Sequence, residues 1–195
     1  MMTEKEKMIR GEFYDTRDPE LRTLSSNAKD LMRIYNNLPA ENIELRNRII
    51  RMLFGNCGEN VRVNQPVFVD YGCNISIGSN SLVNMNCTLL DTGKIIIGSD
   101  TLIGPDVKIY TAVHPLNITE RIYIDKDGTK ATRTKTAAVT IGSGVWIGGG
   151  TIILPGVTIG DNVVIGAGSV VTKSIPANTI ACGNPCTVKK RLNES

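Results

Sequence analysis

Between residues 139 and 172 an aliphatic side chain returns every six positions. The column consists of Ile141, Ile147, Ile153, Ile159, Ile165 and Val171. Neither an α-helix nor a single β-strand has a period of six. Short strands joined by tight turns do have such a period, and they stack coil upon coil into a parallel β-helix. A glycine-rich pair of sandwich strands is the alternative, but sandwich strands keep no fixed short period. The repeat therefore predicts a mainly β solenoid.

The same repeat appears earlier in the chain, in two shorter blocks. Their members are Tyr71, Ile77, Val83 and Leu89, and then Ile97, Ile103 and Ile109. The register slips by two residues near Asp91 and Thr92, and again between Val113 and Val139. A solenoid must loop such slips out, and loops on a rigid scaffold often carry function. We therefore expect the chemistry at these two places.

Three segments of different composition divide the chain: residues 1–56, 57–187 and 188–195. The first lacks the repeat, and its apolar spacing predicts an amphipathic helix through Ala28, Leu31, Met32, Tyr35 and Leu38. A second helix is expected through Leu45 and Leu53, with Pro39 in its first turn and Gly55 after its end. This helical cap should cover the open first coil of the β-helix in residues 57–187.

A long loop, residues 115–138, interrupts the β-helix and is rich in charge and threonine. Asp127 and Gly128 predict a hairpin within it. A loop of this length is usually functional or disordered. We expect residues 120–135 to reach over a binding pocket, and the tail at 188–195 to end in a short helix or strand.

Bulk properties exclude several classes of function. The formal net charge is only +3, so no nucleic-acid footprint is expected. No apolar stretch is long enough to span a membrane, and the charged N-terminus does not look like a signal peptide. We expect a cytoplasmic protein with no membrane association. The five cysteines are predicted to be free thiols, and Cys182 and Cys186 to flank a turn instead of binding a metal.

His114 is the only histidine, and it stands where the repeat breaks into the long loop. An imidazole exchanges a proton near neutral pH, which suits a general base acting on a poor nucleophile. A purely structural histidine is the alternative. The position at the mouth of the loop favours the catalytic interpretation.

These residues and their surroundings resemble the hexapeptide-repeat acyltransferases, and within them the sugar O-acetyltransferases typified by maltose and galactoside acetyltransferases. The resemblance covers nearly the whole chain. It includes the N-terminal segments 3–9 and 11–14, which resemble the helical region of the maltose acetyltransferase subgroup. The other matching motifs are residues 70–72, 84–87, 110–115, 145–149, 155–160 and 166–173.

The resemblance implies a left-handed β-helix with about 18 residues in each coil of three repeats. It also implies a homotrimer with acetyl-CoA bound between adjacent subunits. His114 would take the proton from a sugar hydroxyl, which attacks the thioester directly. Asn84 would lie near the reacting centre, and the backbone N–H of Gly149 would stabilise the oxyanion. Neither an acyl-enzyme nor a metal is expected.

Further matches concern the two substrates. Asp15, Asp70 and Thr92 match sugar-contacting positions, although Asp15 could instead cap a helix and Asp70 could close a turn. The expected cofactor contacts are Gly149, Ala167, Thr172, Lys173 and Lys190, and the alternative for Lys173 is a merely solvated charge. Thr187 replaces an arginine common in the family, Ala138 replaces a proline, and the loop after His114 is about eight residues longer.

The sequence thus predicts an acetyl-CoA-dependent O-acetyltransferase acting on a sugar or glycoside. One alternative keeps the chemistry but changes the acceptor to an antibiotic, an amino sugar or an envelope saccharide. Another is a β-helical binding protein without turnover. A zinc carbonic anhydrase of the same fold needs three histidine ligands, and this chain has one histidine.

Overall fold

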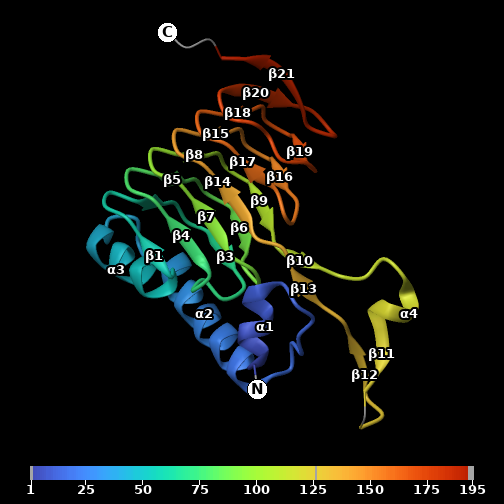
Figure 1. Ribbon diagram of the computed structural model, residues 1–195. Coiled ribbons are helices and arrows are strands. Elements are labelled where there is room, and N and C mark those ends of the chain that lie inside the picture. The colour runs from blue at the N-terminus through green and yellow to red at the C-terminus, as the bar shows by residue number, and fades with distance from the viewer. Residues whose placement is uncertain (1, 126, 193–195) are drawn as a thin grey trace.

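The computed structural model describes residues 2–125 and 127–192. Short parallel strands stack into a three-faced solenoid, helices gather at its N-terminal end, and one long excursion leaves its side (Figure 1). The fold class expected from the sequence is confirmed.

Each face of the solenoid is one sheet, and the chain visits the three sheets in turn. Sheet 1 contains β1 (Asn56–Cys57), β4 (Ile75–Ile77), β7 (Ile95–Ile97), β14 (Val139–Ile141) and β17 (Thr158–Ile159). Sheet 2 contains β2 (Arg62–Val63), β5 (Leu82–Val83), β8 (Leu102–Ile103), β15 (Trp146–Ile147), β18 (Val164–Ile165), β20 (Thr179–Cys182) and β21 (Thr187–Arg191). Sheet 3 contains β3 (Val67–Val69), β6 (Cys87–Leu90), β9 (Lys108–Tyr110), β16 (Ile152–Ile153) and β19 (Val170–Val171).

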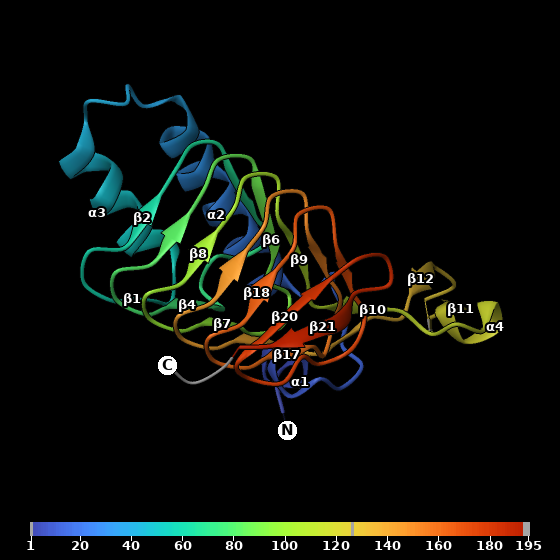
Figure 2. The same ribbon diagram turned by 90° about the horizontal axis from the view of Figure 1, so that it is seen from above.

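The repeated aliphatic column fills the interior of this solenoid. Ile147 and Ile153 are fully buried, and Ile141 is only 1% exposed. Successive side chains on a strand point to opposite faces, so the residue before each of them points outward. Stacked apolar side chains from all three sheets form one continuous core. Figure 2 shows from above how the strands of these sheets wind around that interior.

The coils before the excursion are longer than those after it. Ile75 pairs with Ile95 and Leu82 with Leu102, which is 20 residues per coil. Trp146 pairs with Val164, which is 18. Val164 pairs with Ile180, which is 16. The expectation of about 18 residues therefore holds for the coil that follows the excursion, but neither for the earlier coils nor for the last one.

The two additional residues of each long coil lie where the chain passes from sheet 3 to sheet 1, at residues 70–73 and 91–93. Tyr71 consequently does not belong to the aliphatic column, contrary to expectation. It packs instead against Met8, Tyr14 and Leu21 of the N-terminal segment. The excursion leaves the solenoid at the same corner of the next coil.

Three helices precede the solenoid: α1 (Glu4–Arg10), α2 (Pro19–Asn37) and α3 (Ile43–Leu53). Asp18 caps α2 through its side chain, and Pro19 occupies the first turn, where a missing N–H costs nothing. Tyr35 of α2 and Ile50 of α3 join the solenoid core, so these helices cover the first coil as expected.

The helix predicted through Leu45 and Leu53 corresponds to α3, and its predicted start at Pro39 is wrong. Helix α3 begins at Ile43 after Asn42, and Pro39 lies in the preceding turn, where its carbonyl accepts a hydrogen bond from the Asn42 N–H. Gly55 does follow the helix. A Cβ atom there would lie 2.1 Å from the Cys73 carbonyl oxygen, so only glycine fits.

The excursion contains strand β10 (Ala112–Val113), helix α4 (Ile118–Arg121), and strands β11 (Ile122–Ile124), β12 (Lys130–Thr132) and β13 (Lys135–Thr136). Strands β10 and β13 form its base, and β11 and β12 form an antiparallel hairpin at its far end. Gly128 has φ +76° in the hairpin turn. The predicted hairpin is confirmed.

The opposite end of the solenoid is closed by β21, which runs antiparallel to β20. The tail therefore forms a strand, although its residues 193–195 lie outside the described residues. All five cysteines are unbonded, and Cys182 and Cys186 flank a turn, as expected. None of the described helices combines the length and the apolar composition needed to cross a membrane.

Candidate active site

Most of the predicted site residues lie at two opposite edges of sheet 3. We call the edge at which the chain arrives from sheet 2 the leading edge, and the edge at which it departs toward sheet 1 the trailing edge. The leading edge carries Asn84, Gly149 and Ala167. The trailing edge carries Asp70, Thr92, His114, Thr172 and Lys173.

A single chain does not bring the two groups together. Asn84 precedes β6, and about six residues of extended chain, or roughly 20 Å, cross sheet 3 before the trailing edge. His114 lies beyond that edge, at the end of β10. Lys190 lies in β21 of sheet 2, opposite Ile180, and Asp15 lies in the N-terminal segment.

His114 is held by the base of the excursion. Its Nδ1 lies 2.9 Å from the carbonyl oxygen of Arg133 and 3.5 Å from the hydroxyl of Thr134. A carbonyl oxygen only accepts, so this hydrogen bond requires a proton on Nδ1. In the neutral ring Nε2 is then the unprotonated nitrogen. The side chain is exposed, so Nε2 is available to a substrate.

The side chain of Asn84 is also oriented by neighbours. Its Oδ1 accepts hydrogen bonds from the Asn64 side chain at 3.0 Å and from the Met85 backbone N–H at 2.8 Å. Because the oxygen is engaged, the Nδ2 hydrogens are the part of the amide that remains available to donate.

A groove of about 540 Å³ follows the leading edge. Asn84, Gly149 and Ala167 line it together with Leu82, Leu102, Ile103, Gly104, Pro105, Trp146, Gly148, Val164, Ile165 and Gly166. The N–H groups of Gly148 and Gly150 donate to carbonyl oxygens at 2.8 Å. The Gly149 N–H donates to no group among the described residues, so a backbone donor is free in this groove.

Asp70 presents a half-buried carboxylate at the trailing edge, and its side chain makes no hydrogen bond to the described residues. Burial, reinforced by the nearby Asp91 carboxylate, raises the pKa of Asp70 to about 6. The alternative that Asp70 closes its own turn is wrong, because the turn is closed by Asp91.

Asp91 was not among the predicted site residues, although the sequence marked the register slip at its position. Its Oδ1 accepts the N–H groups of Asp70 at 3.0 Å and Tyr71 at 2.9 Å, and its Oδ2 accepts that of Asn74 at 3.2 Å. Asp91 is fully buried. Burial raises the pKa of Asp91, and the N–H donors oppose that rise. The register slip at residues 91–92 was the signal that could have identified it.

Thr92 is linked to the next coil. Its hydroxyl lies 3.0 Å from that of Thr111, whose own proton goes to the Leu90 carbonyl oxygen at 2.7 Å. Thr92 is therefore the donor in the pair, and its oxygen remains free only to accept.

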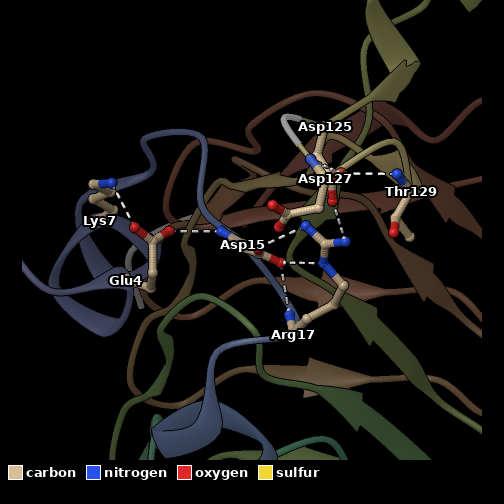
Figure 3. Close-up of polar contacts among 7 residues, drawn as sticks. All are labelled: Glu4, Lys7, Asp15, Arg17, Asp125, Asp127 and Thr129. Atoms are coloured by element: carbon tan, nitrogen blue, oxygen red, sulfur yellow. Dashed lines mark hydrogen bonds and ion pairs between the residues drawn. The ribbon is translucent and has the colours of Figure 1, made fainter.

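Asp15 is engaged by Arg17, which sequence reasoning missed (Figure 3). The Asp15 carboxylate accepts the backbone N–H, Nε–H and one terminal N–H of Arg17, each at 2.9 Å. These bonds hold the pKa of Asp15 below its usual value. The alternative that Asp15 caps a helix is wrong, because Asp18 caps α2.

Thr172, Lys173, Thr187 and Lys190 are exposed. Neither lysine forms an ion pair with the described residues. Their roles as cofactor contacts, and the alternative of a solvated Lys173, remain predictions.

Two family models match this chain. The maltose acetyltransferase hexapeptide capping motif matches residues 7–58, and the bacterial transferase hexapeptide with six repeats matches residues 138–173. A putative acetyltransferase of Saccharomyces cerevisiae is 42% identical over 190 residues, covering 97% of this chain and 93% of the relative. Nodulation protein L of Rhizobium meliloti is 43% identical over 187 residues, covering 96% and 98%.

Solved structures agree over almost the full length. A maltose O-acetyltransferase from Clostridium difficile has a TM-score of 0.92 at 48% identity, with 99% of both chains covered. A galactoside acetyltransferase in complex with coenzyme A has a TM-score of 0.90 at 38% identity, covering 99% of this chain and 92% of that one. A hexapeptide-repeat acetyltransferase from Vibrio cholerae, complexed with acetyl-CoA, has a TM-score of 0.86 at 35% identity and covers 99% and 100%. The chain belongs to the hexapeptide-repeat acetyltransferases, close to the maltose and galactoside O-acetyltransferases.

Proposed function

We propose that the protein transfers an acetyl group from acetyl-CoA to a hydroxyl of a sugar or glycoside, with His114 as general base. The site would form between subunits of a homotrimer. The observation that carries this proposal is the exposed imidazole of His114, whose Nδ1 is bonded to a backbone carbonyl so that Nε2 can accept a proton.

The reaction needs three groups from this chain. His114 Nε2 takes the proton of the acceptor hydroxyl while its oxygen bonds to the thioester carbonyl carbon. The free N–H of Gly149 and the amide of Asn84 stabilise the oxyanion. The C–S bond then breaks, and the imidazolium returns the proton to the CoA thiolate, which regenerates the base.

Two subunits are required because the base and the oxyanion donor lie at opposite edges of sheet 3. A closed ring of three copies in head-to-tail contact would set the trailing edge of one subunit beside the leading edge of the next. The groove at Gly149 and Ala167 has the size of a small-molecule site, and it would take the pantetheine of acetyl-CoA. Lys190 from sheet 2, and Thr172 and Lys173 from a trailing edge, would complete the cofactor site. CoA or acetyl-CoA in the structures of two relatives supports this assignment.

The trailing edge favours a hydroxyl-rich acceptor. Asp70 offers a carboxylate that no described residue engages, Thr92 offers an acceptor oxygen, and Asp15 retains one lone pair beyond those that Arg17 engages. Sugar hydroxyls need such acceptors once they leave water. The maltose and galactoside names of two relatives support the same class.

A different acceptor for the same chemistry is favoured by one observation. The hairpin of residues 122–132 lies on the same side of the solenoid as the trailing edge and contacts the Asp15 region. We propose that this hairpin selects the acceptor, which extends the candidates to an amino sugar, an antibiotic or an envelope saccharide.

Mixing inactive subunits tests the shared site. His114→Ala removes the base from the trailing edge, and Ala167→Trp fills the groove of the leading edge. Each homotrimer should be inactive. Co-refolding equal amounts should restore about a quarter of wild-type turnover, because each mixed ring contains one intact pairing of the two edges.

The matched control mixes His114→Ala with His114→Asn, two variants of the same edge, and should restore nothing. Turnover is measured as thiol release from acetyl-CoA over a panel of sugars. Absence of restoration, with mixed trimers verified by mass spectrometry, would contradict the shared site.

A further inference from the structure

The guanidinium of Arg17 joins two segments that are far apart in the sequence. It binds the Asp15 carboxylate through Nε and one terminal nitrogen, and it binds Asp125 through the other terminal nitrogen at 2.6 Å (Figure 3). Asp125 lies 108 residues further along the chain, at the start of the hairpin turn. Arg17 therefore bridges the N-terminal segment and the far end of the excursion.

Asp125 organises the hairpin turn as well as binding Arg17. Its Oδ1 accepts the N–H groups of Asp127 at 3.0 Å and Thr129 at 2.8 Å, and its Oδ2 faces Arg17. Its side chain is 11% exposed, compared with 35% for Arg17 and 41% for Asp15. A carboxylate that has three donors and little exposure holds its position better than an isolated surface charge.

The remaining contacts between the two segments lie nearer the base of the excursion. The Tyr14 N–H donates to the Thr134 carbonyl oxygen at 3.2 Å, and the Thr136 hydroxyl donates to the Met8 carbonyl oxygen at 2.6 Å. The Arg133 guanidinium lies over the ring of Phe13. These contacts hold β13, whereas the Arg17–Asp125 pair holds the tip of the hairpin.

A single exposed ion pair contributes little to stability, but a bidentate arginine that bridges two carboxylates forms a network with fixed geometry. Lysine could not replace it fully, because an ammonium group lacks the planar fork that engages both oxygens of Asp15. The bridge therefore requires an arginine at position 17 and the carboxylate that the hairpin presents.

We propose that Arg17 is a positioning residue for the acceptor site, which fixes the hairpin of residues 122–132 against Asp15 so that the two form one wall of the acceptor pocket. That this pocket takes the acceptor rests on the function proposed above. The position of the hairpin does not, because the bridge involves only residues of this chain. Arg17 also directs the Asp15 carboxylate, leaving it one lone pair for a substrate hydroxyl.

Two variants and one matched control test this proposal. Arg17→Gln removes the bridge, and Asp125→Asn weakens it from the other side. Asp127→Asn makes the same charge change in the same turn, but the Asp127 side chain makes no hydrogen bond to the described residues. Arg17→Lys keeps the charge without the fork and should give an intermediate result.

Limited digestion with trypsin measures how readily the hairpin opens, and it requires no sugar or acetyl-CoA. Arg17→Gln and Asp125→Asn should speed cleavage after Arg121 and Lys130 by about three- to tenfold, because proteolysis follows the population of the open form. Asp127→Asn should digest like the wild type. Unchanged digestion of both bridge variants would overturn the proposal.

Steady-state kinetics test whether the hairpin and Asp15 form a wall of the acceptor pocket. Arg17→Gln should raise KM for the best acceptor of the wild type by about tenfold and leave KM for acetyl-CoA within about twofold, since misplacing a positioning group acts on its own substrate. Faster digestion with an unchanged acceptor KM would overturn the positioning role. Failure of the proposed function would look different, because the wild type itself would then acetylate no sugar.

Discussion

The two edges of sheet 3 differ in regularity, and the difference separates two kinds of chemistry. At the leading edge every described coil keeps the six-residue spacing, as from Val83 to Leu89 and from Ile147 to Ile153. At the trailing edge the early coils insert two residues, and a later coil inserts the whole excursion. The regular edge offers the backbone N–H of Gly149, the Asn84 amide and small side chains, whereas the irregular edge offers His114, Asp70 and Thr92.

A physical reason underlies this division. Stacked strands place backbone groups in fixed positions. The N–H groups of Gly148 and Gly150 donate to carbonyl oxygens of neighbouring coils, and the Gly149 N–H between them donates to no described group. Polar side chains need room and new partners, which insertions supply. The trailing edge therefore requires its own stabilising contacts, such as those of Asp91 and Arg17.

The largest expected effect concerns the base at the irregular edge. His114→Ala should lower kcat by about 10² to 10⁴, because proton abstraction from the acceptor hydroxyl is lost. The affinity for CoA, measured by calorimetry, should stay unchanged because His114 does not line the groove and is not among the proposed cofactor contacts. Turnover near that of the wild type would contradict the assignment of the base to the irregular edge.

The next effect concerns the stability of the irregular edge. Asp91→Ala leaves three backbone N–H groups without an acceptor at a buried position and should lower the free energy of unfolding by about 2–4 kcal/mol. Urea denaturation measures this change.

The matched control for Asp91 is Asp161→Ala, at a corner without insertion. Asp161 is exposed and accepts one backbone N–H, from Ser143 at 2.7 Å. Its loss should cost at most about 1 kcal/mol. Equal losses in the two variants would remove the contrast between inserted and regular corners.

The smallest effect concerns the pH dependence of stability through Asp70. Its pKa of about 6 in the folded protein exceeds the ordinary value of 3.8. The stability that it contributes is therefore complete below pH 3.8 and is lost as the pH rises through about 6. Asp70→Asn cannot lose a proton, so relative to the wild type it should gain about 1 kcal/mol between pH 5 and pH 7, after allowance for solvent screening.

Urea unfolding of both proteins at the two pH values measures the Asp70 effect. Asp100→Asn, an exposed carboxylate between β7 and β8 and away from the trailing edge, serves as the control and should show no such gain. A constant difference between wild type and Asp70→Asn across this range would show that Asp70 ionises like a solvated carboxylate.

Local patterns determined much of the fold. The six-residue period predicted the β-helix, and Asp127 with Gly128 predicted the hairpin. The spacing from Ala28 to Leu38 predicted the second half of α2, which ends at Asn37 with Leu38 as its C-cap. These features depend on neighbouring residues, and a single sequence displays them directly. The placement of Pro39 was wrong because a proline favours the turn before a helix as readily as its first turn.

Only the tertiary structure decided which residues meet at the trailing edge. Tyr71 keeps the six-residue spacing from Ile77 and yet leaves the column, because helix α1 and residues near it provide an apolar surface that the repeat cannot anticipate. Asp91 reaches back one coil to close the turn at Asp70, and Arg17 reaches Asp125 across 108 residues. A periodic pattern specifies how the chain stacks on itself, because each coil repeats the same local contacts. Charged and hydrogen-bonded contacts between distant segments have no period, so they are specified only once the coils, the helices and the excursion lie in their final positions.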